Sequence, residues 1–384
     1  MELTERQKEG VGIAVQRYKN HEKYTVIAGY AGTGKSTVVE YIVKELGLKN
    51  EDVAYCAYTG RAAKVLRDKN CPNAMTTHRL LFNSHENADG TFTHIPKDNL
   101  ACDYKLIVVD EVSMLPKYFF ELMLKHGVHI ICLGDPGQLP PVATGNDTDH
   151  HLLDHPHVFL DEIMRQAADN EIIKLSMDIR NGEPLLYQRG KDVCVIPYNK
   201  LSDKIMLGAD IMLCATNKKR IAMNQYCREV LYGEDVPPYP LSGEKIICLK
   251  NNYQYENDSD TPLINGSVGT ISDIDISPSK LFGHTMMANF NADDGMFYQI
   301  PMDYKMFTEH VETINKDNFK KFRKEKVKPC LFDYAYCCTV HKAQGGQYDR
   351  VIVFVENFPH DAETRKKWLY TAVTRAASKL IIVM

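Results

Sequence analysis

The most constraining stretch of this chain of 384 residues is a glycine-rich segment near its start. An apolar run at 26–28 leads into residues 29–36 (GYAGTGKS), a spacing typical of a phosphate-binding loop between a strand and a helix. Such glycines let the backbone approach a polyphosphate and turn its N–H groups toward the phosphate oxygens. Lys35 is then expected to reach the β- and γ-phosphates, and Ser36 to bind Mg²⁺. A glycine-rich surface turn with an exposed lysine is the alternative, but apolar residues at helical spacing over 38–46 favour nucleotide binding.

The composition is that of an ordinary soluble globular protein, with 44% hydrophobic and 25% charged residues, and the length suits two or three domains. A net charge of −4 argues against a protein that coats nucleic acid through bulk charge, but it is compatible with a narrow basic groove. The 11 cysteines form no C-x-x-C pair, which indicates reduced thiols rather than a zinc site or a disulfide scaffold. Without a signal core or 18 successive apolar residues, we expect no membrane contact and a cytoplasmic location, in a bacterial cell or a phage-infected host.

Gln7, in a helix predicted over 3–19, has two roles open to it. Thr4 suits the N-cap and Gln7 follows it by three residues, which is the spacing of a capping box. The alternative is that the Gln7 amide contacts the polar edge of an adenine, just before the phosphate loop. Its position in the sequence does not decide between the two.

Two acids that end an apolar run at 106–109 are candidates for the catalytic centre. All-apolar strands are typical of parallel sheets covered on both faces, and ligands bind at the carboxyl ends of such strands. We expect Asp110 to hold Mg²⁺ through its water shell and Glu111 to orient and deprotonate an attacking water. Adjacent acids at a strand end are also common caps, and the phosphate loop upstream is what favours catalysis.

Two further side chains are candidates to sense the γ-phosphate. Gln138 lies in a stiff Gly/Pro turn after the apolar run at 128–133, where an amide could couple the nucleotide state to a second site. An ordinary turn glutamine is the alternative. Arg165 follows a short apolar run at 158–160 and could reach across a cleft, although taken alone it resembles a surface helix residue.

Two predicted helix starts carry hydroxyl and basic side chains. Thr59 and Arg61 follow a strand at 52–58, and Thr77 and His78 lie at the second start. Backbone N–H groups at a helix N-terminus attract phosphate, so both segments could hold a nucleic-acid backbone. Solvated helix caps are the alternative.

The remaining segments predict two insertions and a second α/β unit. Residues 82–104 are polar and contain an Asp-Gly turn, which indicates a small hairpin. A domain change is expected near 166–205. Alternation of polar and apolar residues within 266–330 predicts a small β-barrel, and residues 334–383 have the pattern of a closing α/β unit.

Taken together and in order, these stretches resemble a superfamily-one DNA helicase of the RecD/Dda-like group. The resemblance implies an α/β fold with two RecA-like P-loop domains and ATP in the cleft between them. Residues 1–165 would form the first domain, with the hairpin insertion at about 82–104, and residues 166–384 the second, with the β-barrel insertion at about 266–330. The matching motifs, besides Gln7, are GTGKST (32–37), TGRAAK (59–64), TTHRLL (76–81), VVDEVSM (108–114), GDPGQLPPV (134–142), LDEIMRQ (160–166), NGSVGT (265–270), TVHKAQG (339–345) and LYTAVTRA (369–376).

The resemblance also implies residue roles. Catalysis and sensing of the γ-phosphate would fall to Lys35, Asp110, Glu111, Gln138, Arg165 and Arg375. Nucleotide binding would involve Gln7 at the adenine together with Gly32, Thr33, Gly34, Lys35, Ser36, Thr37 and Gly346. The single-strand path would be lined by Thr59, Arg61, Thr77, His78, Thr339 and His341. Many relatives have an acid that meets the ATP ribose where this chain has Gln347, so the ribose contact is not carried over.

The implied function is an ATP-dependent helicase that moves 5′ to 3′ on single-stranded DNA and opens duplex at a junction. We expect ATP and Mg²⁺ as cofactors, a monomer, and replication or recombination proteins as partners. Phe92, beside the hairpin turn, is a candidate wedge between base pairs. The alternatives are a single-strand translocase or protein-displacing motor, a subunit of a recombination or nuclease complex, and a nucleotide kinase, which would not explain the second α/β unit.

Overall fold

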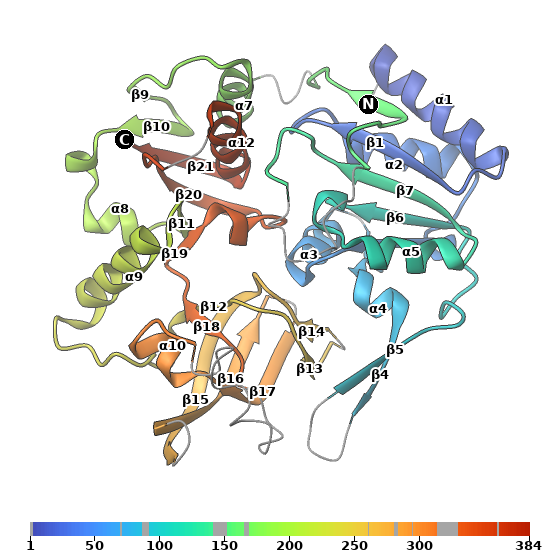
Figure 1. The fold of residues 1–384 in the computed structure, drawn as a ribbon. Coiled ribbons are helices and arrows are strands. Elements are labelled where there is room, and N and C mark those ends of the chain that lie inside the picture. The colour runs from blue at the N-terminus through green and yellow to red at the C-terminus, as the bar shows by residue number, and fades with distance from the viewer. Residues whose placement is uncertain are drawn as a thin grey trace.

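Two parallel α/β domains lie side by side, with a hairpin extending from the first and a third sheet beside the second (Figure 1). The computed structural model describes residues 3–69, 71–86, 92–140, 152–164, 169–259, 261–279, 283–293, 295–312, 329–358 and 361–384. Within these residues, no helix combines the length and the hydropathy that crossing a bilayer requires.

The first domain is built on a sheet whose strand order is β3-β2-β6-β7-β1-β8, with every neighbouring pair parallel. Helices α1, α2 and α3 pack on one face and α4 and α5 on the other, so the sheet has two apolar cores. Burial on both faces explains why these strands are nearly continuous apolar runs. The strands are β1 (Tyr24–Gly29), β2 (Val53–Ala57), β3 (Met75–Thr76), β6 (Leu106–Asp110), β7 (His129–Gly134) and β8 (Val158–Leu160), and the helices are α1 (Glu5–Lys19), α2 (Lys35–Glu45), α3 (Gly60–Asp68), α4 (Thr77–Leu81) and α5 (Lys117–Lys125).

The second domain repeats this plan with the order β19-β11-β20-β21-β10-β9, parallel except for the β9–β10 pair. Helices α7 and α12 cover the face nearer the first domain's phosphate loop, and α8 and α9 cover the other. The strands are β9 (Gln188–Arg189), β10 (Val193–Ile196), β11 (Ile211–Cys214), β19 (Cys337–Thr339), β20 (Tyr348–Phe354) and β21 (Ala376–Val383), and the helices are α7 (Glu171–Asn181), α8 (Asp203–Leu207), α9 (Asn217–Tyr232) and α12 (Ala362–Val373).

Two β insertions depart from the main sheets. The hairpin of β4 (Phe82–Glu86) and β5 (Phe92–Pro96) is a separate antiparallel pair. The second insertion is an antiparallel sheet of order β17-β16-β15-β12-β18, and a bridge from Met302 to Cys330 links the end of one edge strand to the approach of the other. Its members are β12 (Lys245–Cys248), β15 (Val268–Ser279), β16 (Gly283–Ala292), β17 (Gly295–Met302) and β18 (Phe332–Tyr334), with β13 (Asn252–Glu256), β14 (Pro262–Leu263) and α10 (Tyr304–Thr308) beside it.

The predicted start of this insertion, residue 266, is too late. The sheet already includes β12, which pairs with β15 and with β18, a strand some eighty residues further along the chain. Two ion pairs anchor the inserted sheet to helix α9 of the second domain. They join Arg228 to Glu244 at 2.8 Å, and Arg220 to Asp333. All four side chains are buried, and each pair neutralises charges that would be costly to leave alone in the interior.

Candidate nucleotide-binding cleft

The phosphate loop has the backbone conformation that its glycines were expected to allow. It leaves β1 at Gly29 and enters α2 at Lys35, and Gly32 and Gly34 both adopt positive φ, near 78° and 79°. A side chain at Gly34 would also collide with the Gln7 amide, since a Cβ there would lie 2.5 Å from Nε2. The Lys35 ammonium donates hydrogen bonds to the carbonyls of Gly29 and Tyr30, at 2.6 and 3.0 Å, so it lies over its own loop.

The predicted acids lie at the carboxyl end of β6, beside this loop. Burial, and then the neighbouring charge of Glu111, raise the pKa of Asp110. A cation placed beside the Asp110 carboxylate would therefore stabilise its ionised form. Asp110 accepts a hydrogen bond from the backbone N–H of Glu111 at 2.9 Å. Glu111 has a φ of 51°, a left-handed conformation that is uncommon for a residue with a side chain and that concentrates at functional sites.

The second domain contributes Arg375 to the same cleft. Its guanidinium donates to the carbonyl of Gly346 at 3.1 Å and lies 3.9 Å from a carboxylate oxygen of Glu111. A cavity of about 570 Å³ runs between the domains here. It is lined by predicted residues from both sides: Gly32, Gly34, Lys35, Ser36, Thr37, Asp110, Glu111 and Gln138 from the first domain, and Gly346 and Arg375 from the second.

Tyr370 and Asp135 are members of this cleft that sequence reasoning missed. The Tyr370 hydroxyl accepts from the backbone N–H of Ala31 in the phosphate loop at 2.8 Å and donates to the Asp135 carboxylate at 2.7 Å. Both side chains are buried, and burial raises the pKa of Asp135. Asp135 directly follows β7, just as Asp110 ends β6, so its position after an apolar run was a signal that could have found it.

Two further hydrogen bonds join the domains beside Gln138. The Thr371 hydroxyl accepts from the backbone N–H of Leu139 at 2.8 Å, and the Gln344 amide donates to the Leu139 carbonyl at 2.7 Å. The turn that carries Gln138 is therefore held directly by α12 and by the segment after η5 (Val340–Ala343). A shift of one domain relative to the other would move this turn, and the coupling role of Gln138 stays a prediction.

The structure gives Gln7 the cap role and also brings it to the phosphate loop. The side-chain oxygen Oε1 of Gln7 accepts from the backbone N–H of Thr4 at 3.0 Å, which completes the capping box. Its amide nitrogen donates to the carbonyl of Thr33 at 3.0 Å. Thr33 itself is buried, and its hydroxyl donates to Tyr30 rather than facing the cavity. The adenine contact of Gln7 stays a prediction, and Arg165 lies outside the described residues.

Comparison with known families agrees with this two-domain site. A model of the AAA domain matches residues 2–193, and a model of the UvrD-like helicase C-terminal domain matches residues 334–383. The chain belongs to the RecD/Dda/Pif1-like group of superfamily 1 helicases. This confirms the family predicted from the ordered motifs.

Known relatives of this superfamily 1 chain include two curated helicases. It is 26% identical over 385 residues to the ATP-dependent RecD2 DNA helicase of Deinococcus radiodurans, a match that covers 93% of this chain and 46% of that protein. It is 29% identical over 193 residues to the ATP-dependent DNA helicase Dda of phage T4, covering 47% of this chain and 43% of Dda. The chain thus matches less than half the length of either relative.

Solved helicase structures share the fold. The Bacteroides Pif1 helicase in complex with ADP-AlF3 and single-stranded DNA aligns over all of this chain and 92% of that one, with a TM-score of 0.51 and 18% identity. A Pif1 structure on DNA unwinding at forked duplex gives a TM-score of 0.50 at 18% identity, with the same coverage. At this identity the likeness concerns the fold alone, and it confirms the predicted pair of RecA-like domains.

The residues predicted to line the path of single-stranded DNA in this superfamily 1 fold have different surroundings. Thr59 caps α3 and Thr339 precedes η5, so each begins a corresponding segment of its domain. Arg61 stacks on Tyr348, with its guanidinium carbon 3.7 Å from the ring centroid, and pairs with Asp293 at 2.8 Å. These contacts tie α3 to the second domain. His341, in η5, is partly exposed.

The expected exposure of these residues to a strand needs correction, because the side chains of Thr59, Thr339, Thr77 and His78 are all buried. The His78 ring is stacked between Phe82 and Tyr253, with centroid distances of 4.6 and 5.4 Å, and so does not line an open surface. Phe92 begins β5, but its side chain lies outside the described part of the chain.

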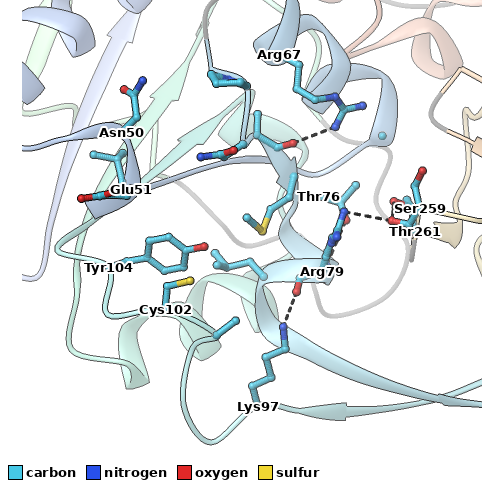
Figure 2. Close-up of a pocket in the computed structure, with 18 residues that line it drawn as sticks. Asn50, Glu51, Arg67, Thr76, Arg79, Lys97, Cys102, Tyr104, Ser259 and Thr261 are labelled. Carbon is cyan, nitrogen blue, oxygen red and sulfur yellow. Dashed lines mark hydrogen bonds between the residues drawn. The ribbon is translucent and has the colours of Figure 1, made fainter.

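A second, basic cavity of about 710 Å³ lies between α3, α4, the base of the hairpin and the turn before β14 (Figure 2). Among the described residues that line it, Arg67, Arg79 and Lys97 are basic and Glu51 is acidic. Figure 2 shows that each cation donates to a backbone carbonyl: Arg67 to Ala74, Arg79 to Ser259, and Lys97 to Arg79. Sequence reasoning missed this group because its members come from three separate segments.

Proposed function

We propose that this chain is an ATP-driven DNA helicase that moves 5′ to 3′ on single-stranded DNA and opens the duplex ahead of it. The observation that carries the proposal is the composition of the cleft. Lys35, Asp110 and Glu111 come from one RecA-like domain and Arg375 from the other, around one cavity. A site built from both domains is complete only when they are close together, so nucleotide chemistry is tied to domain movement.

The residues present fit a magnesium nucleotide. Hydroxyl and carboxylate oxygens are the ligands that Mg²⁺ prefers, and Ser36 and Asp110 supply one of each beside the loop. A bound Mg²⁺ would neutralise charge on the phosphate oxygens. The raised pKa of Asp110 supports this assignment, because a buried carboxylate with an acidic neighbour is stabilised by a cation.

In the proposed reaction, Glu111 orients a water molecule and takes its proton as the water attacks the γ-phosphate of ATP. Lys35 leaves the carbonyls that it now contacts and binds the phosphates, while Arg375 stabilises the charge that develops on the transferred group. Loss of the γ-phosphate removes the group that Arg375 and Gln138 contact, and the cleft opens.

Alternate gripping of the strand would turn this opening into a step. Thr59 and Thr339 begin matching segments in the two domains, which supports one strand-contacting segment in each domain. The relatives named as ATP-dependent DNA helicases, and the Pif1 structure bound to single-stranded DNA, support DNA as the track. The basic cavity at Arg79 and Lys97, beside the hairpin, is the proposed contact at the junction.

We also propose that the enzyme acts as a cytoplasmic monomer, with replication or recombination proteins as partners. All eleven cysteines are free thiols, as in a reducing compartment. Light scattering after gel filtration, with and without DNA, tests the monomer directly.

The deciding experiment measures ATP hydrolysis with and without single-stranded DNA, and then unwinding of duplexes with a 5′ or a 3′ tail. Stimulation by the strand, and unwinding from the 5′ tail only, is the expected result. Stimulation without unwinding would instead indicate a translocase or a subunit of a larger complex. No effect of the strand on hydrolysis would exclude DNA as the track.

A further inference from the structure

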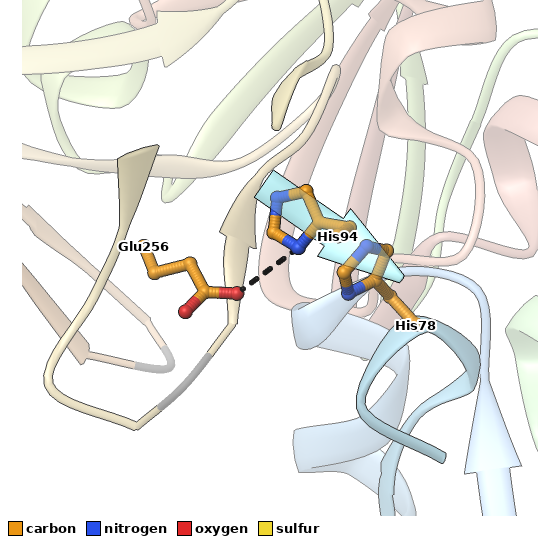
Figure 3. A group of neighbouring side chains, drawn as sticks. All are labelled: His78, His94 and Glu256. Atoms are coloured by element: carbon orange, nitrogen blue, oxygen red, sulfur yellow. Dashed lines mark ion pairs between the residues drawn. The ribbon is translucent and has the colours of Figure 1, made fainter. Parts of the chain in front are cut away.

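Three potential metal ligands converge where the hairpin meets the second insertion (Figure 3). His78 comes from α4, His94 from β5 and Glu256 from the end of β13. One ligand atom from each residue lies within 4.8 Å of the others. The site is well screened from water, with His78 5% exposed and the side chains of His94 and Glu256 9% and 4% exposed.

The surroundings of His94 fix which of its nitrogens carries hydrogen. Its Nε2 faces the backbone carbonyl of Tyr253, which can only accept, so Nε2 is the N–H donor. In the neutral ring Nδ1 then presents a lone pair, and it lies 3.5 Å from a Glu256 carboxylate oxygen. Ser84 contacts both groups but has a single hydroxyl proton to give. A lone pair and a carboxylate at this distance repel each other unless positive charge lies between them.

His78 adds a buried nitrogen, Nδ1, that has no hydrogen-bond partner among the described residues. The ring cannot easily turn away, because Phe82 and Tyr253 sandwich it. Its ring centroid lies 4.4 Å from that of His94. A buried nitrogen without a partner is costly, and a ligand would remove that cost.

We propose that His78, His94 and Glu256 bind a zinc-type divalent transition metal, with water as the fourth ligand. Two imidazoles and a carboxylate suit Zn²⁺, whereas Mg²⁺ and Ca²⁺ prefer oxygen alone. Ligands on a tetrahedral zinc lie roughly 3.3 Å apart. The His94–Glu256 pair at 3.5 Å already fits, and no other pair, each within 4.8 Å, must close by more than about 1.5 Å. The Tyr253 carbonyl then acts as the outer hydrogen-bond acceptor that orients a ligating histidine.

Such a metal would join the first domain to the insertion of the second domain, at a place separate from the candidate nucleotide cleft. His78 and His94 belong to the first domain and its hairpin, and Glu256 belongs to the insertion of the second. Zinc would therefore hold the hairpin against β13. This inference does not depend on the proposed helicase activity, because it concerns metal binding alone.

The test is metal binding by the purified full chain after treatment with a chelator and removal of that chelator. Zn²⁺ is titrated in competition with a chromophoric chelator, and Co²⁺ is added in parallel. We expect one Zn²⁺ per chain and the visible absorption of tetrahedral Co²⁺. Glu256→Gln, which keeps the shape of the side chain, should weaken zinc binding at least tenfold, and His94→Ala should abolish binding at this site. His85→Ala is the matched control, since His85 is an exposed histidine of the same hairpin.

Two results would overturn the proposal. One is the absence of stoichiometric zinc binding by the wild-type chain. The other is zinc binding that Glu256→Gln and His94→Ala leave unchanged, which would assign the metal to surface thiols such as Cys102. Circular dichroism of each variant separates loss of the site from loss of the fold.

Discussion

The two halves of this chain meet at two places that differ in chemistry. In the cleft, Tyr370, Thr371 and Gln344 hydrogen-bond to the phosphate-loop domain. At the hairpin, His78 stacks on Tyr253, and His94 lies against Glu256. The cleft uses groups that a nucleotide also needs, since the phosphate-loop N–H groups and Lys35 are phosphate donors. The hairpin contact uses none of them, so the proposed nucleotide turnover would change the first contact without directly changing the second.

The largest expected effect comes from Glu111→Gln, which should impair the chemistry of the cleft and leave the hairpin contact unchanged. Loss of a general base costs typically 10²- to 10⁴-fold in rate, so ATP hydrolysis should fall by roughly that factor. Nucleotide affinity should be retained, because Glu111 acts on water rather than on the phosphates. Hydrolysis is measured at saturating single-stranded DNA, and zinc binding serves as the control that should not change. A loss of less than tenfold would mean that another group is the base.

Tyr370→Phe tests whether the cleft contact is a real link between the domains. Removing this hydroxyl takes the partner from the Ala31 N–H and from one oxygen of the buried Asp135 carboxylate, whose other oxygen keeps the hydrogen bond from the Gly137 N–H. An unsatisfied buried polar group costs about 1–3 kcal/mol, so the free energy of unfolding at pH 7.5 should fall by that amount. Urea unfolding measures it, with Tyr298→Phe as control because that tyrosine is exposed on β17.

The pH dependence of this loss has a defined sign. Burial raises the pKa of Asp135, so the folded state loses stability as the pH rises through the raised pKa and the carboxyl ionises. The Tyr370 hydroxyl, among other contacts, lowers this pKa and so counteracts the effect of burial. Without the hydroxyl the ionised carboxylate is less well stabilised. The loss should therefore be larger at pH 7.5 than at pH 5, where more of the carboxyl is protonated. An equal loss at both pH values would show that Asp135 is not responsible.

Part of the cleft could be predicted from the sequence, and part of it could not. Lys35, Asp110 and Glu111 were predicted because each sits at a fixed offset from a strand or helix end, and parallel strands bring those ends to one edge. Arg375 was predicted only from the resemblance to the helicase group. Tyr370 lay inside a recognised motif, but its partner is more than two hundred residues away. Its role depends on how the domains pack, which local spacing does not encode.

The hairpin contact was beyond sequence reasoning for a related reason. His94 lies in the hairpin of the first domain and Glu256 in the insertion of the second, far apart in sequence, and neither belongs to a motif. His78 was assigned to a DNA path because it lies at a predicted helix start and in a motif that resembles the helicase group, yet the aromatic rings of Phe82 and Tyr253 stack on it. Long-range pairing likewise set the start of the second insertion, where β12 joins strands distant in sequence.

Phe92→Ala addresses the hairpin's role without touching the cleft. Stacking of a base on an aromatic ring is worth roughly 1–3 kcal/mol, similar to the roughly 1.4 kcal/mol of stacking in one base-pair step. If Phe92 is the wedge, unwinding should slow up to about tenfold, while hydrolysis stimulated by single-stranded DNA stays unchanged. Single-turnover unwinding of a 5′-tailed duplex measures this. Unwinding as fast as wild type would remove Phe92 from the mechanism.

The smallest expected effect belongs to the basic cavity at the base of the same hairpin. If Arg79 and Lys97 contact phosphates, the double variant Arg79→Ala, Lys97→Ala should bind single-stranded DNA more weakly, and its affinity should depend less on salt. Each lost contact reduces the slope of log affinity against log salt by roughly 0.7 for single strands, so a change of about 1.4 is expected. Fluorescence anisotropy over a range of salt concentrations measures the slope, with Lys44→Ala, an exposed lysine of α2, as control. A weaker affinity with an unchanged slope would mean that the substitutions disturb the packing of Ser259 and the hairpin base, because only lost phosphate contacts alter the number of counterions released.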